Sequence, residues 1–134
     1  MNLNKKFLVI SFLTASLTLP SLVSQGQAQN CKNSFNNTLG YFNKGQFEYV
    51  NSYLNECVES FKNKEYYDYF RNNENGITTV FRVYKLIINS YKKLEQESLA
   101  VRKMNELVAF YENKFSREAV EKKLYEAQLI PIDY

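Results

Sequence analysis

The stretch FNNTLGYFNKGQFEYVNSYLNECVESF, residues 35–61, holds two apolar patterns separated by a single glycine, Gly45. Its apolar residues at helical spacing are Phe35, Leu39 and Phe42, then Phe47, Val50, Tyr53, Leu54, Val58 and Phe61. A glycine that directly follows polar residues is typical of a helix end. We therefore expect two short antiparallel helices, over residues 33–44 and 46–61.

A second pair of helices is expected further along the chain. Apolar residues recur at helical spacing over residues 77–94 and again over 96–113, with charged residues on the opposite side of the second segment. Between the two pairs, residues 62–75 are polar and aromatic without a sustained period, so we expect a connector or an irregular short helix. Gly76 is expected to close this insert.

A terminal helix follows the second hairpin. Ser116 is a suitable N-cap residue, and the segment runs to about Gln128 before Pro131 stops it, which leaves residues 129–134 as a short tail. The sequence thus predicts one all-α domain over residues 29–128. It consists of two hairpins, about 33–61 and 77–113, and a C-terminal helix.

The two hairpins repeat one another at a spacing of 50 residues. The residues Tyr41, Gly45, Phe47, Val50, Leu54 and Cys57 have as counterparts Tyr91, Glu95, Glu97, Ala100, Met104 and Leu107. Hairpins of this kind have an apolar face that neither can bury alone, and stacking buries both. Two unrelated amphipathic hairpins would also give similar offsets, so the spacing alone leaves both explanations open.

The residue inventory excludes several kinds of chemistry. The 134 residues contain no His, no Trp and only two Cys, so histidine-based catalysis, a Ser-His-Asp triad and His- or Cys-rich zinc sites are absent. The glutamate pairs that could suggest a glycosidase, such as Glu118 and Glu121, fall on expected solvated faces. We expect no enzymatic activity, no cofactor and no metal.

The N-terminus has the features of a secretory signal peptide over residues 1–28. Lys5 and Lys6 precede an apolar run over residues 7–19, and Ala28 offers a small residue for cleavage. A retained membrane anchor and a lipoprotein cleaved before Cys31 are the alternatives. The apolar run is too short for a transmembrane helix, which needs about 20 apolar residues, so we expect no transmembrane anchor after cleavage. Cleavage after Ala28 lowers the formal charge from +3 to +1, so we expect no nucleic-acid binding.

Export also determines how the two cysteines are interpreted. In an oxidising compartment two lone thiols of a small domain form a disulfide more often than they stay free. In an antiparallel hairpin the start of one helix lies beside the end of the next, so Cys31 and Cys57 should be neighbours. We expect a Cys31–Cys57 disulfide that holds the first hairpin closed.

The motif Tyr41-Phe42-Asn43-Lys44-Gly45-Gln46-Phe47, with the early Cys31 and a helix that closes on Leu54…Cys57-Val58, resembles small exported tetratricopeptide-like proteins of Bacteroidota. The resemblance spans roughly residues 31–113. Glu95 stands where the second hairpin of that pattern would have its turn glycine. The resemblance implies a scaffold of stacked helical hairpins that acts as an adaptor at outer-membrane or cell-surface machinery.

Two groups of residues are candidates for partner binding. The insert places Tyr66, Tyr67, Tyr69 and Phe70 close together, and these aromatic side chains are expected either to form an interface or to fold back onto the core. If the repeat register holds, Arg82, Tyr84 and Tyr91 face the inner groove of the helix stack, although core packing explains the two tyrosines equally well.

Together these features predict a non-enzymatic adaptor or scaffold of the bacterial cell envelope, in the periplasm or at the outer membrane or cell surface. The expected partner is a protein whose identity the sequence does not give, and self-association is a further possibility because two hairpins make a short stack. The alternatives are a structural subunit of an outer-membrane-associated complex and a small secreted enzyme or toxin.

Overall fold

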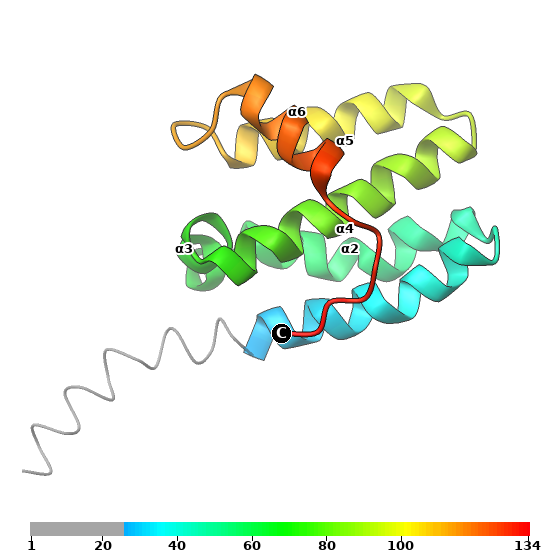
Figure 1. Cartoon of the computed structure of the whole chain (residues 1–134), viewed down its shortest axis with the longest axis horizontal. Helices are drawn as coiled ribbons and strands as arrows, with labels where there is room; N and C mark the ends of the chain where they lie inside the picture. Colours follow the sequence, from blue (N-terminus) through cyan, green and yellow to red (C-terminus); the bar gives the residue numbers. More distant parts are fainter. Residues whose placement is uncertain (1–25) are drawn as a thin grey trace, which may run out of the picture.

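The structure is a computed structural model that describes residues 26–134. It is all-helical over this range, as predicted, and contains no strand there (Figure 1). The helices are an N-terminal helix over residues 26–43, the 3₁₀ turn η1 (Phe47–Tyr49), α2 (Val50–Phe61), α3 (Lys64–Asn72), α4 (Glu74–Lys93), α5 (Glu97–Phe110) and α6 (Arg117–Glu126).

The predicted signal peptide lies outside the described residues except for residues 26–28. These three residues belong to the N-terminal helix, which therefore extends further back than the predicted start at residue 33. Ala28 is buried in the core. Within residues 26–134, none of the helices combines the length and the apolar character needed to span a bilayer.

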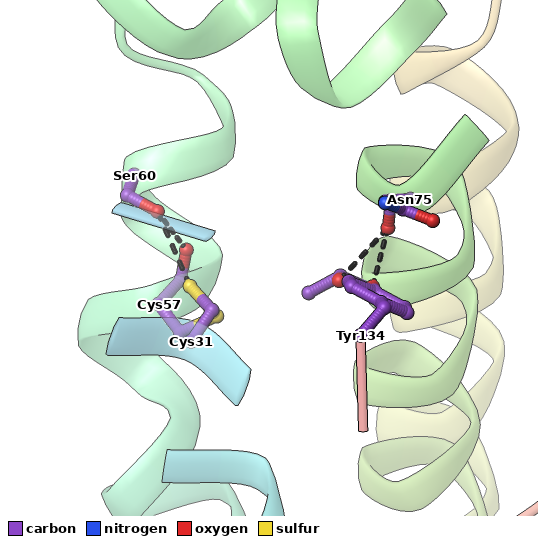
Figure 2. Close-up of a disulfide and its surroundings, with 6 residues drawn as sticks. Cys31, Cys57, Ser60, Asn75 and Tyr134 are labelled. Atoms are coloured by element: carbon purple, nitrogen blue, oxygen red, sulfur yellow. Dashed lines mark hydrogen bonds between the residues drawn. A yellow bond between two sulfur atoms is a disulfide. The ribbon is translucent and has the colours of Figure 1, made fainter. Parts of the chain in front are cut away.

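The first hairpin pairs the N-terminal helix with α2. Cys31 and Cys57 form the predicted disulfide, with their Cα atoms 5.2 Å apart, and both cysteines are buried (Figure 2). Ser60, one turn after Cys57, donates a hydrogen bond of 2.5 Å to the Cys57 carbonyl and lies 3.7 Å from the Cys31 sulfur. The Cys31–Cys57 disulfide thus joins the two helices of the hairpin.

The second hairpin, α4 with α5, packs on the first through α2. α4 is the central helix, because α2, α3, α5 and α6 all contact it. Its buried residues fall on most of its circumference: Gly76, Thr79, Val80, Phe81, Val83, Tyr84, Leu86, Ile87, Ile88 and Ser90. A helix that is apolar nearly all round belongs at the centre of a domain. One continuous core results.

Residues 62–75, predicted to be a connector or an irregular short helix, contain the regular helix α3 (Lys64–Asn72) and the start of α4. The asparagine side chains at its two boundaries explain this difference: Asn63 accepts a hydrogen bond from the Glu65 amide, and Asn73 accepts one from the Asn75 amide to begin α4, both at 2.9 Å. These are ordinary N-caps. Tyr111 of the second hairpin fastens α3 in place by donating a 2.8 Å hydrogen bond to the Phe70 carbonyl.

Gly76 does not close the insert as predicted, since it lies in the first turn of α4. A Cβ atom at this position would stand 2.5 Å from the main-chain oxygen of Tyr69. A glycine here lets α4 approach the end of α3 closely.

The turns of the two hairpins have the same hydrogen bonds at the 50-residue spacing found in the sequence. The Gln46 amide bonds to the Tyr41 carbonyl at 2.9 Å, and the Gln96 amide bonds to the Tyr91 carbonyl at 2.8 Å. Inside each of these bonds lies a second one, from Gly45 to Phe42 and from Glu95 to Lys92, both 3.0 Å long. Each turn is therefore a Schellman motif.

Tyr41 and Tyr91 have equivalent backbone roles but different side-chain surroundings. Tyr91 is half-buried and shares a cavity wall with residues of η1 and of the first turn of α2, among them Phe47 and Asn51. Tyr41 is 36% exposed, because no described helix stands before the first hairpin in the way that α2 stands before α4. The first hairpin is thus the open end of the stack.

The opposite end of the stack is covered by α6, which packs on α4 and α5 through Val120 and Leu124. Ser116 is its N-cap, as predicted, and accepts a hydrogen bond of 3.1 Å from the Ala119 amide. α6 ends at Glu126, two residues before the predicted end.

We predict that the Cys31→Ser, Cys57→Ser double variant is less stable than the oxidised protein by about 3.5 kcal/mol, because a closed loop of this length restricts the unfolded chain by roughly that amount. Urea unfolding of the oxidised protein, the reduced protein and the variant measures the difference. Equal midpoints for the oxidised and reduced protein would contradict the prediction.

We predict opposite effects for matched changes in the two turns. Gly45 and Glu95 both have positive φ, 78° and 58°. Glu95→Gly should raise the free energy of unfolding by about 0.5–1 kcal/mol, and Gly45→Ala should lower it by about 1 kcal/mol, because only glycine adopts this region without a steric penalty. Thermal unfolding of both variants tests this, and effects of the same sign would be contrary to expectation.

Candidate functional site

Residues 127–134, the C-terminal segment, contain no helix and run across the helix stack. The segment leaves the end of α6, passes over α4 and ends beside the N-terminal helix (Figure 1). It therefore touches the first helix of each hairpin. Its contacts define the most extensive polar interaction between distant parts of the described chain.

On the N-terminal helix, the Asn36 side chain forms two hydrogen bonds with the main chain of Ile132. The Asn36 amide nitrogen donates to the Ile132 carbonyl at 3.0 Å, and the Ile132 amide donates to the Asn36 side-chain oxygen at 2.8 Å. One turn earlier, the Lys32 ammonium donates to the main-chain oxygen of Tyr134 at 2.7 Å. Ile132 is 2% exposed, so its side chain belongs to the core.

On α4, two cations bind main-chain carbonyls of the same stretch. The Arg82 guanidinium donates to the carbonyls of Ile130 at 3.4 Å and Pro131 at 3.2 Å. The Lys85 ammonium donates to the carbonyls of Tyr125 at 2.8 Å and Ala127 at 2.5 Å, where α6 ends. Positive charge is favourable at a helix C-terminus. Burial lowers the pKa of Lys85 from its ordinary value.

Tyr134 fixes the segment at the start of α4. Its hydroxyl donates a 2.5 Å hydrogen bond to the Asn75 carbonyl and also contacts the Thr79 hydroxyl (Figure 2). Burial raises the pKa of the Tyr134 phenol above its ordinary value, so the hydroxyl stays protonated and can donate. Tyr134 is thus the one side chain of the segment that forms hydrogen bonds with α4.

We call the residues that hold the segment the tail-binding face: Lys32, Asn36, Asn75, Thr79, Arg82 and Lys85. Lys32 and Arg82 are 50 residues apart, so they occupy equivalent positions of the two hairpins. Each of them donates to main-chain oxygen of the segment. The 50-residue repeat therefore places one cation from each hairpin, Lys32 and Arg82, beside the same extended segment.

Two cavities beside the segment show that it does not fill this side of the molecule. One, of about 320 Å³, lies between α4 and α6 and is lined in part by Thr78, Arg82 and Lys123. The other, of about 240 Å³, borders Tyr134 and is lined in part by Gln29 and Asn73. The side chains around the second cavity are mostly polar.

The structure places the predicted binding residues in different environments. Arg82 belongs to the tail-binding face. Phe70 and Tyr84 are buried in the core and do not reach the surface. Burial raises the pKa of the Tyr84 phenol, as expected for a hydroxyl among apolar side chains. Tyr91 is half-buried between the hairpins.

The other aromatic residues of α3 are divided between core and surface. Tyr66 and Tyr69 are half-buried against the core. Tyr67 is exposed, and its ring meets the edge of Phe110 while the Arg71 guanidinium lies over it. Three of the four aromatic side chains of α3 therefore pack against the core, and Tyr67 stays at the surface. Tyr69 also lines the cavity next to Tyr134.

Sequence reasoning missed five of the six residues of the tail-binding face, namely Lys32, Asn36, Asn75, Thr79 and Lys85. Two signals could have pointed to it. Lys32 and Arg82 share the 50-residue spacing, and Ile130 and Ile132 alternate around Pro131, as in an extended segment with one buried side.

A second surface at the open end of the stack also escaped the sequence analysis. Tyr41, Tyr49 and Tyr53 are all exposed, and the rings of Tyr41 and Tyr53 are stacked with centroids 5.0 Å apart. A hydrogen bond with Tyr41 raises the pKa of Tyr53. Next to them is an open cavity of about 490 Å³ with polar walls that include Asn37 and Lys44.

The acidic residues that could suggest catalysis are dispersed. Glu56, Glu59, Glu95, Glu97, Glu118 and Glu121 are all exposed. Within residues 26–134 no group of three or more acidic or cysteine side chains is placed to hold a metal ion. Comparisons of the chain with models of protein families, with curated proteins and with solved structures give no match.

We predict that Asn36→Ala lowers the free energy of unfolding by about 2 kcal/mol more than Asn37→Ala, because it removes two partly buried hydrogen bonds to Ile132. Asn37 is the matched control, since it has the same side chain on the same helix but is exposed. Both changes alter helix propensity equally. Similar denaturation midpoints for the two variants would argue against the hydrogen-bonded contact.

Proposed function

We propose that this protein is an exported, non-enzymatic interaction domain of the bacterial cell envelope, built from two tetratricopeptide-like hairpins, and that it binds a protein partner through the tail-binding face. The observation that carries the proposal is how this face holds the C-terminal segment. Helical side chains from both hairpins bind the main chain of an extended segment, and one aliphatic side chain enters the core.

This kind of contact suits the recognition of another protein. Main-chain hydrogen bonds provide affinity for any extended segment, and pockets for individual side chains provide selectivity. Lys32 and Arg82 present donors that match main-chain oxygens, and Asn36 matches both the N–H and the C=O of one residue because it both donates and accepts. A flat polar helix surface would offer no such arrangement.

The domain architecture supports the same proposal. α2 against α4 joins the hairpins into one rigid stack, α6 covers one end, and the disulfide fixes the helix that carries Lys32 and Asn36. Binding residues placed on rigid helices hold their geometry better than residues on loops. A disulfide in so small a domain is also consistent with export.

A structural subunit of an outer-membrane-associated complex is the second candidate function. The exposed tyrosines Tyr41, Tyr49 and Tyr53 at the open end of the stack favour it, because tyrosine is enriched at protein interfaces. In this alternative the open end of the stack would be the docking surface, and the tail-binding face would serve only to fasten the chain.

Site-specific photo-crosslinking in the producing cells tests the proposed function. A benzophenone amino acid at Thr78, beside the tail-binding face, should give a reproducible crosslink to another protein. The control is the same amino acid at Val101, which is exposed on α5. Arg82→Glu should abolish the crosslink from position 78, because it reverses the charge that meets the partner's carbonyl groups.

Several outcomes would contradict the proposal. A crosslink from position 101 equal to that from position 78 would remove the tail-binding face as the interface. A crosslink only from an amino acid introduced at Tyr49 would favour the second candidate function. N-terminal sequencing of the exported protein should begin at Gln29, and a retained N-terminus would contradict cleavage of the predicted signal peptide.

A further inference from the structure

We propose that the C-terminal segment is an intramolecular competitor for the tail-binding face, and that the partner displaces it with an extended segment in which an aliphatic residue stands two positions before a tyrosine. This inference rests on the proposed function and names the partner's chemistry and the regulation of the same site.

The segment is attached in a way that permits its release. Of its last five residues only Ile132 is buried, whereas Ile130, Pro131, Asp133 and Tyr134 are exposed. Lys32, Asn36 and Arg82 all bind its main chain, which any extended chain can supply. Removing the segment therefore exposes the Ile132 side chain, the half-buried side chains of Ala127 and Leu129, and a set of polar groups that water can satisfy.

The contacts made by the side chains of the C-terminal segment determine which residues a partner segment needs in order to replace it. The buried position of Ile132 requires an aliphatic residue, since a polar group there would lose its hydration without a partner. Two residues later, the Tyr134 hydroxyl reaches the Asn75 carbonyl and the Thr79 hydroxyl. A phenylalanine in place of Tyr134 would remove the hydroxyl that contacts the Asn75 carbonyl and the Thr79 hydroxyl. The pattern aliphatic, any residue, tyrosine follows.

The open cavities give a partner the means to displace the segment. The polar cavity beside Tyr134 is lined by Gln29 and Asn73, and residues 127–134 leave it open. A partner segment that extends into this space gains contacts that the competitor lacks. Differential contact of this kind is what shifts an occupied site toward a new ligand.

Peptide binding to the complete disulfide-bonded protein tests the inference. The probe is a fluorescent peptide with the sequence of residues 128–134, acetylated and amidated, measured by fluorescence anisotropy. Ile132→Asp in the protein should release the intramolecular segment and increase the affinity for the peptide about tenfold or more over wild type, because the free face becomes populated. Ile130→Asp, at an exposed position, is the matched control and should bind like wild type.

Two further variants show where the peptide binds. Asn36→Ala added to Ile132→Asp should weaken peptide binding about tenfold, because it removes both hydrogen bonds to the peptide's main chain. A peptide with Asp in place of its second isoleucine, the counterpart of Ile132, should not bind. If Ile132→Asp fails to fold by circular dichroism, the milder Tyr134→Phe replaces it, with an expected increase of about two- to fivefold.

The results separate this inference from the proposed function. Absence of saturable peptide binding to a folded variant overturns the inference, while a crosslink from position 78 in the same variant leaves the proposed function standing. A wild-type dimer that the peptide dissociates would mean that the segment is exchanged between two copies, which overturns the choice of a separate partner. Absence of both peptide binding and crosslinking removes both proposals.

Discussion

The packing of α2 against α4 is the constraint on which the rest of the structure depends. Each hairpin has an apolar face that its own two helices do not cover, and this contact buries the face of the first hairpin on the second. Across it the buried rings of Phe61 on α2 and Tyr84 on α4 have their centroids 6.2 Å apart. The contact also fixes the relative position of Lys32 and Arg82, which come from different hairpins.

The disulfide and the C-terminal segment act on this stack in complementary ways. Cys31–Cys57 holds the N-terminal helix to α2 within the first hairpin. The C-terminal segment reaches from α6 back to the N-terminal helix, so it spans the hairpins from end to end (Figure 1). The first is covalent and permanent under oxidising conditions, whereas the second consists mostly of main-chain hydrogen bonds and can open.

The sequence allowed the helices, the hairpin turns and the disulfide to be predicted, because each has a local or periodic signal. Gly45 marked the first turn, and the 50-residue spacing located the second at Glu95 even though its glycine is missing. α3 was missed as a regular helix because it buries little of its surface and therefore lacks a sustained apolar period. The capping residues Asn63 and Asn73 were the available signal.

The candidate site was less predictable for a physical reason. Lys32, Asn36 and Lys85 act through polar side chains on main-chain atoms of a distant segment, and such contacts leave no periodic pattern in either partner. Arg82 was identified because it follows from the register of the repeat. For Tyr84 and Tyr91 the sequence left groove and core packing as equal explanations, and because α4 is central the first is buried and the second is half-buried.

Native-state amide hydrogen exchange of Ile132 tests the central claim most directly, because its amide donates to Asn36 and is protected only while the segment is bound. If the segment is a releasable ligand, the Ile132 amide exchanges through a local opening with a free energy well below that of core α4 amides such as Leu86. The same opening free energy for Ile132 and Leu86 would show that the segment leaves only when the whole domain unfolds, and would contradict the account.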